Sequence, residues 1–249
     1  LKKMVLKEEL KSLAIERVVV EVKKGLEGKK PSQMFRCLCE CGALNQILPG
    51  INPNKKTNSD YVELGLLIEK NIVNISPDNK FLLILLIPFF SKNFSTNKIN
   101  YSENQEKNLL EHLGLSKSQK KLYESLKSEK ENIDNFFSLQ PKDKLDCLNR
   151  LDFFRRPEIT FAILKMLVIL NTIENKPLQS DLSSNDDIKQ QDDFVKKQST
   201  LLKKMTDLLN TIIDLSAKKK QSFDSTMDGD QIKMQIYNER LMILERLES

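Results

Sequence analysis

The spacing of apolar residues in one late segment restricts the fold of this chain most strongly. Leu201, Met205, Leu208, Ile212 and Leu215 recur at alternating intervals of four and three residues, which is the repeat of one face of an α-helix. The sequence shows no strand-like alternation, and among its 249 residues Gly (7) and Pro (8) are scarce. We therefore predict an all-α protein, built as a multi-helical elongated array.

Further helices follow from the same spacing and from start and stop signals. A helical pattern over 3–26 is broken near Leu13, and a helix is expected from Pro31 to Cys41, with Gly42 as its stop. Two polar segments, 52–59 and 174–193, are expected to be a break and a mobile loop. The other predicted helices cover about 60–74, 79–90, 103–114, 117–136, 141–151, a segment that begins at Pro157, the segment around 201–215, and 230–247.

The most apolar run does not have the length of a membrane span. FLLILLIPFF, residues 81–90, is about half of the roughly 20 residues that a transmembrane helix needs, and Pro88 interrupts it. We expect a buried core helix here and no membrane partner. The first residues lack the apolar core of a signal peptide. With four cysteines and no secretion signal, we expect reduced thiols and a cytoplasmic location.

The charge of the chain permits nucleic-acid binding without requiring it. Lys and Arg number 40 against 35 Asp and Glu, a net charge of +5. Three basic clusters are candidate RNA contacts: Lys29 with Lys30, Arg155 with Arg156, and Lys218, Lys219 and Lys220. Each cluster alone is more often a solvated helix end than a phosphate contact. Together they would form a track for an RNA backbone if they share one face.

The cysteines and the single histidine do not form a metal site by spacing. On a helix Cys37 and Cys41 are neighbours, but Cys39 points about 200° away, and Cys147 is distant in sequence. His112 is the only histidine and has no nucleophile near it in sequence. We therefore predict no metal ligands and no catalytic residues in this chain.

The acidic clusters do not indicate a cation site either. The segment from Asp224 through Asp228 and Gly229 begins like a calcium loop, but Gln235 stands where a bidentate Glu is required. A second cluster, Asp186, Asp187, Asp192 and Asp193, is expected to be solvated. The sequence contains no GxxxxGK[ST], GxGxxG or HExxH motif.

One stretch of the chain nevertheless resembles a known family. SLAIERVVVEVKKGLEGKKPSQMFRCLCECGALNQILPGI resembles the neck region of bacterial class II CCA-adding tRNA nucleotidyltransferases, which belong to the poly(A) polymerase/tRNA nucleotidyltransferase family. The matching positions are Glu16, Arg17, Glu21, Pro31, Ser32, Leu38, Cys41, Gly42, Ala43, Leu44 and Pro49. Two later segments resemble the same enzymes, one through residues 152–157 and one through Gly229, Ile232, Ile236 and Arg240.

The resemblance implies a C-terminal neck, body and tail that bind tRNA. It implies a neck-like segment over 1–50, a body over 51–173, the polar loop over 174–193, and a tail over 194–249. In the neck, Glu16, Arg17 and Glu21 are expected to brace helices. The body resembles an HD-type phosphohydrolase module in degenerate form, because Pro88 and Phe89 occupy the positions of the His-Asp pair.

The same resemblance implies that this chain alone is not catalytic. The family's head motifs, which hold metal ions and select CTP and ATP, are absent from the sequence. Mg²⁺ and CTP or ATP are therefore expected only for a complete enzyme, whose head would be a separate or preceding polypeptide. The sequence does not distinguish CCA addition from A-only addition or polyadenylation. Nor does it indicate the oligomeric state.

Two alternatives remain open at the level of sequence. The first is a helical protein-interaction module or decayed relative without tRNA binding, which would show the same apolar spacing between Leu201 and Leu215. The second is an active HD phosphohydrolase, which the presence of a single histidine disfavours.

Overall fold

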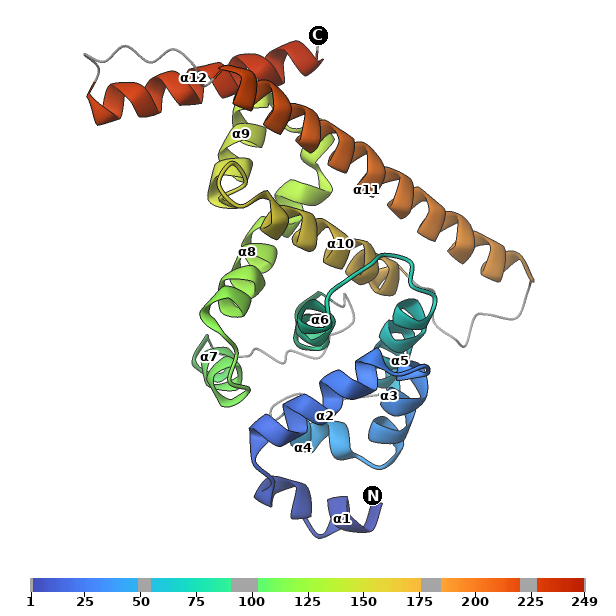
Figure 1. Cartoon of the computed structure of the whole chain (residues 1–249). Coiled ribbons are helices and arrows are strands. Elements are labelled where there is room, and N and C mark those ends of the chain that lie inside the picture. The colour runs from blue at the N-terminus through green and yellow to red at the C-terminus, as the bar shows by residue number, and fades with distance from the viewer. Residues whose placement is uncertain (1, 49–54, 91–102, 176–184, 220–227, 249) are drawn as a thin grey trace. The chain divides into compact units, whose positions relative to one another are not determined.

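The computed structural model describes residues 2–48, 55–90, 103–175, 185–219 and 228–248, and within these ranges it is all-α with no strand (Figure 1). The helices α1 to α7 are Lys2–Leu6, Ile15–Glu27, Pro31–Glu40, Ala43–Ile47, Lys55–Glu69, Pro77–Phe90 and Glu103–His112. The helices α8 to α12 are Lys117–Asp134, Pro141–Arg150, Pro157–Glu174, Asn185–Lys219 and Gly229–Glu248. Short 3₁₀ turns cover Glu9–Ser12 and Phe136–Ser138. The predicted all-α fold class is confirmed.

The chain forms two compact units. The first contains residues 1–123 and 165–199, and the second contains 124–164 and 200–249. Each unit is therefore assembled from two separate stretches of sequence. Helices α8, α10 and α11 each contribute residues to both units. The predicted division into four consecutive segments remains a prediction.

The core of the first unit is centred on a close crossing of α3 and α5. Gly65 allows this approach, because a Cβ atom there would lie 2.4 Å from Ser32 Cα. Ser32 is buried, and its backbone N–H donates to Glu69 Oε1 at 2.8 Å. Tyr61 is also buried and stacks on Phe35, with 5.8 Å between the ring centroids.

Helix α6 is the buried core helix that its apolar sequence predicts. Every residue from Phe81 to Pro88 is buried, because apolar residues surround this part of the helix and must be shielded from water on all sides. Lys23 of α2 anchors the N-terminal end of α6 through an ion pair with Asp78 at 2.6 Å. In the described part of the chain, no helix combines the length and apolarity needed to span a membrane.

The second unit packs α9 against α12 and joins α9 to the end of α8 (Figure 1). Arg150 donates to both oxygens of the buried Glu129, at 2.6 and 3.0 Å. Burial acts to raise the pKa of Glu129, but the hydrogen bonds from Arg150 and Asn132 outweigh it, so the pKa lies below its usual value.

Two of the predicted loop segments are partly helical. Residues 55–59 belong to α5, so the predicted polar break is wrong there, and α5 ends at Glu69 because Asn71 adopts a left-handed φ of 47°. The predicted loop over 174–193 is wrong for residues 185–193, which begin α11. Neither helical stretch contains Gly or Pro, so no residue type within it opposes the helix. Residues 176–184 lie outside the described ranges.

The predictions near the start of the chain are mostly confirmed. A break does separate two helical stretches near Leu13, and α3 ends just before Gly42, whose φ of 74° suits glycine. The short helix α4, which begins directly after Gly42, was not predicted. It is too short to show a helical period in the sequence.

Candidate nucleic-acid interface

The turn after α9 places three charged residues of the second unit next to one another, namely Asp152, Arg155 and Arg156. Asp152 adopts a left-handed φ of 58°. Its backbone N–H donates to Asn149 O, and that of Phe153 donates to Leu148 O, each at 3.0 Å. This is the hydrogen-bond pattern of a Schellman helix end, with the buried side chains of Leu148 and Phe153 as its apolar pair. Pro157 then begins α10, so Arg155 and Arg156 lie in a tight connection between two helices.

Asp152 holds both arginines of this turn. Arg155 Nη2 and Arg156 Nη2 each lie 2.6 Å from Asp152 Oδ2, and the Nε atoms of both also donate to this carboxylate. These bonds, first from Arg155 and then from Arg156, hold the pKa of Asp152 well below its usual range. The Arg155 side chain is nevertheless 73% exposed. It can therefore meet an anion from solvent while its orientation is fixed.

Helix α12 brings a third guanidinium to the turn. Arg240 stacks over the ring of Phe154, with its Cζ atom 3.6 Å from the ring centroid. Desolvation lowers the pKa of Arg240, and no described carboxylate forms an ion pair with it. Tyr237 Oη donates to Asp146 Oδ1 at 3.0 Å and so ties α12 to α9.

Asp152, Arg155, Phe154 and Arg240 help to line a pocket of about 510 Å³. It lies where the end of α9, the following turn and α12 meet within the second unit, and its lining residues are Asn149, Asp152, Phe153, Phe154, Arg155, Ile236 and Arg240. The two arginines that line the pocket, Arg155 and Arg240, outnumber the single carboxylate of Asp152. The pocket is therefore cationic on one side, whereas Phe153, Phe154 and Ile236 make it apolar elsewhere.

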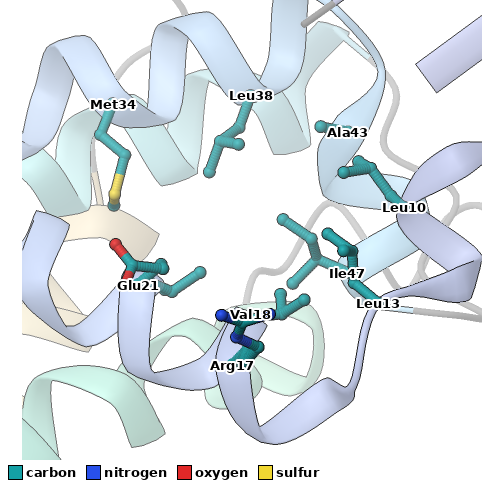
Figure 2. A pocket seen from close by; sticks show the side chains of 10 residues that line it. Leu10, Leu13, Arg17, Val18, Glu21, Met34, Leu38, Ala43 and Ile47 are labelled. Carbon is teal, nitrogen blue, oxygen red and sulfur yellow. The ribbon is translucent and has the colours of Figure 1, made fainter. Parts of the chain in front are cut away.

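The first unit contains a different cavity, of about 440 Å³, in the segment before α5 (Figure 2). Its walls are mostly apolar, and Figure 2 shows side chains from α2, α3, α4 and the segment before α2 that surround one open space: Leu10, Leu13, Val18, Met34, Leu38, Ala43 and Ile47. Arg17 and Glu21 lie together at one border of this space, on α2. Such a groove can take apolar side chains but offers little to an RNA backbone.

The predicted RNA-binding residues fall in different parts of the structure. Lys29 and Lys30 are exposed in the turn between α2 and α3, within the first unit. Arg155 and Arg156 belong to the second unit. Lys218 and Lys219 end α11, with side chains outside the described part, and Lys220 lies outside the described residues altogether. A shared track for the three clusters therefore remains a prediction.

The residues expected to brace the neck lie on α2. Glu16, Arg17 and Glu21 are exposed, and Glu21 Oε1 accepts a hydrogen bond from Lys24 Nζ of the same helix at 2.8 Å. Their proposed role in joining helices remains a prediction.

Cys39 in α3 and Cys41 directly after α3 point to separate partners. Cys39 Sγ lies 4.0 Å from Asn58 O of α5, whereas Cys41 Sγ donates to Leu38 O at 3.6 Å. Burial, followed by the charges near it, raises the pKa of Cys39 to about 11. Cys147 is buried in α9, and burial together with Glu129 raises its pKa to about 12. Both thiols are thus protonated at neutral pH.

The described residues contain no group of three His, Cys, Asp or Glu side chains that could hold a metal ion. His112 is exposed at the end of α7, and the exposed Asp193 pairs with Lys196 at 3.7 Å. The calcium-like segment at Asp224 lies outside the described residues, as do the side chains of Asp186, Asp187 and Asp192.

Sequence reasoning did not identify Arg240 and Phe154 as site residues. Both stood only as positions of family resemblance, in segments more than 80 residues apart. The sequence offered one signal for them. Phe154 is an aromatic residue in one family-like segment, and Arg240 is a basic residue in the other. Only the packing of α12 on α9 shows that these residues touch.

Comparison with known proteins finds a family match in the first part of the chain. Residues 4–55 match a family model described as "Probable RNA and SrmB- binding site of polymerase A". This segment contains the end of α1, all of α2 to α4 and every residue that lines the apolar cavity of the first unit.

Curated relatives specify the resemblance further. The chain is 54% identical over 52 residues to the multifunctional CCA protein of Paraburkholderia phytofirmans, covering 21% of this chain and 13% of the relative. It is 26% identical over 178 residues to the CCA-adding enzyme of Actinobacillus succinogenes, covering 68% of this chain and 44% of the relative. The chain thus spans less than half the length of these relatives. No solved structure matches the chain significantly. The predicted resemblance to the C-terminal part of CCA-adding nucleotidyltransferases is confirmed.

Proposed function

We propose that this chain is a tRNA-binding C-terminal portion of a CCA-adding tRNA nucleotidyltransferase and acts in maturation or repair of the tRNA 3′ end. The observation that carries this proposal is the arginine turn of the second unit. It combines two family-like segments in one cationic pocket, with Arg155 and Arg156 oriented by Asp152. Guanidinium groups held in this way suit phosphate oxygens, and phosphate contacts position a protein on RNA without reading its sequence.

The match of residues 4–55 to an RNA-binding family model supports the same proposal for the first unit. Lys29 and Lys30 are the basic residues of this segment that we propose as additional backbone contacts, because both are exposed at the start of α3. The main proposed contacts with the RNA backbone are Arg155 and Arg156. Lys218, Lys219 and Lys220 are further proposed contacts.

We propose that nucleotide addition requires a catalytic head outside these 249 residues, which would supply the Mg²⁺ and nucleotide sites. The absence of the head motifs from the sequence supports this. We also propose that the body has lost HD-type chemistry, since Pro88 is buried within α6 and His112 is the only histidine. The four free cysteines suit a reducing cytoplasm, which we propose as the location.

A second candidate function is protein interaction without tRNA binding. The specific observation in its favour is the apolar cavity of the first unit, because Leu13 at its border is 44% exposed and an apolar partner segment could cover it. The two candidate functions can be distinguished by salt, because only the tRNA-binding function predicts an affinity for tRNA that falls as salt rises.

The direct test is the salt dependence of tRNA binding. We expect the chain to bind a tRNA transcript with an affinity that falls as salt rises, because phosphate contacts release condensed counterions. The double variant Arg155→Ala with Arg156→Ala should weaken binding and reduce the slope of log affinity against log salt by about one to two. Fluorescence anisotropy with labelled tRNA measures both quantities.

The matched control is Lys203→Ala with Lys204→Ala, which removes the same charge from exposed positions on α11. It should leave the slope nearer to that of the wild type. Absent or salt-independent tRNA binding by the wild-type chain would contradict the proposed function and favour the interaction module.

A further inference from the structure

Arg240 of the second unit is a partly buried cation without an acidic partner among the described residues. Its side chain is half-buried against Phe154 and lines the 510 Å³ pocket, yet no described Asp or Glu forms an ion pair with it. Removing a charge from water costs free energy unless an opposite charge or hydrogen-bond acceptor compensates. The arginines of the neighbouring turn differ, because Asp152 compensates both of them.

The pocket around Arg240 has the size and composition of a nucleotide site. Its volume falls within the range of about 300 to 1,000 Å³ typical of small-molecule pockets. Phe154 and Ile236, which are partly exposed, provide apolar surface, and Asn149 provides an amide that makes no hydrogen bond with another described residue. An amide can both donate to and accept from the edge of a base.

The charge balance of the pocket favours an anion in spite of Asp152. Its carboxylate already accepts hydrogen bonds from Arg155 and Arg156, so its repulsion of a phosphate is largely offset. Arg155 remains exposed beside it, and Arg240 approaches from α12. Two guanidinium groups from separate elements can thus reach one phosphate, a geometry that planar forks satisfy well.

We propose that this pocket binds one nucleotide unit of the RNA, with Arg240 and Arg155 on its phosphate and the base on the apolar wall beside Asn149. The proposal rests on the proposed function and adds a residue and a ligand class to it. Such a site takes a nucleotide that is not stacked within a duplex, because only an unstacked base can enter a pocket.

The first test compares variants of α12 in tRNA binding. Arg240→Met keeps the length of the side chain over Phe154 but removes the charge, and we expect a loss of affinity of roughly tenfold and a salt slope smaller by about one. Lys233→Met removes the same charge from an exposed position on the same helix, where Lys233 pairs only with Asp230 among the described residues. It should change the affinity less than about twofold. Arg240→Lys, which lacks the planar fork, should fall between Arg240→Met and the wild type.

The second test uses small probes on the same chain. Adenosine 5′-monophosphate, adenosine and inorganic phosphate are titrated separately while NMR follows the Nε–H signals of Arg155 and Arg240. We expect the monophosphate to shift both signals and to bind more tightly than phosphate alone, whereas adenosine shifts neither at equal concentration. Asn149→Ala, an exposed position that leaves the core intact, should weaken monophosphate binding severalfold and leave phosphate binding unchanged.

The outcomes separate this inference from the proposed function. If the wild-type chain binds tRNA but Arg240→Met behaves like Lys233→Met, the pocket is not an RNA site and the inference fails alone. Equal affinity for the monophosphate and for phosphate would overturn the nucleoside part of the site. If the wild-type chain does not bind tRNA, the proposed function fails. Circular dichroism of each variant confirms that the helices are retained.

Discussion

At the residue scale, Asp152 combines a backbone role with an electrostatic one. Its left-handed conformation ends α9, and its carboxylate accepts hydrogen bonds from Arg155 and Arg156. Both roles depend on a short acidic side chain, since Asp and Asn adopt this conformation more readily than most residues. The side chains that we propose as phosphate contacts are thus oriented by the carboxylate of Asp152.

Asp152→Asn separates the two roles and predicts a pH-dependent loss of stability. Asn keeps the left-handed turn but not the charge. The pKa of Asp152 is depressed in the folded protein, so its contribution to the free energy of unfolding is fully present above the unfolded pKa of about 3.9 and is lost as pH falls through the folded pKa. We therefore expect wild type to be more stable than Asp152→Asn at neutral pH, and the difference to shrink below about pH 4.

Urea unfolding followed by circular dichroism measures this difference at each pH. Asp230→Asn is the control, because its carboxylate is 92% exposed at the start of α12 and its ion pair with Lys233 is local. A stability difference for Asp152→Asn that stays constant from neutral to acidic pH would contradict the predicted role of its charge.

At the scale of elements, the crossing of α3 and α5 explains two positions of the family-like stretch. Pro31 begins α3, and Ser32 is small enough to lie against Gly65 while its N–H reaches Glu69. A larger residue at either side of the contact would push the helices apart. The Pro-Ser pair of the matching segment therefore has a packing role, independent of any contact with RNA.

Gly65→Ala should therefore destabilise the first unit. The added Cβ would meet the backbone of Ser32 at 2.4 to 2.5 Å, and backbone atoms cannot move aside as a flexible side chain can. We expect a loss of about 2 kcal/mol in the free energy of unfolding, measured by urea denaturation. Gly229→Ala at the start of α12 meets no atom within 4 Å and should have a much smaller effect. Equal effects of the two variants would show that the close crossing is not limiting.

At the scale of the whole molecule, three helices contribute to both compact units. Helices α8, α10 and α11 cross from one set of residues to the other without a break. Ending a helix in its middle would leave unpaired backbone groups at the new ends. Unfolding one unit therefore removes packing from helices that the other unit also uses, so we expect the units to unfold together.

Cys147 tests this expectation, because the other three cysteines lie in the first unit. Cys147 is buried and its pKa is raised to about 12, so it should react with iodoacetamide only after the second unit unfolds. Mass spectrometry can separate its labelling from that of the exposed Cys37. The labelling midpoint in urea should coincide with the midpoint of circular dichroism, and clearly separate midpoints would show independent units.

The sequence by itself determined the helices with strong apolar periods or clear ends. The all-α class, the buried run in α6, the stop at Gly42 and the resemblance around Pro31 and Ser32 could all be inferred from residue types at fixed spacing. Segments without such a period were the ones misassigned, namely the starts of α5 and α11 and the short α4. Helix propensity alone is a weak signal, and packing elsewhere in the same helix decides where it begins.

Only the tertiary structure decided which residues form the candidate site. Arg155 and Arg156 were candidates by charge, but the carboxylate that orients them and the third arginine that joins them were not visible in the sequence pattern. Arg240 reaches Phe154 because α12 packs on α9, a contact between segments more than 80 residues apart. Local sequence patterns indicate local structure. A pocket between distant segments depends instead on how the apolar faces of helices pack, and similar apolar faces occur in many sequences.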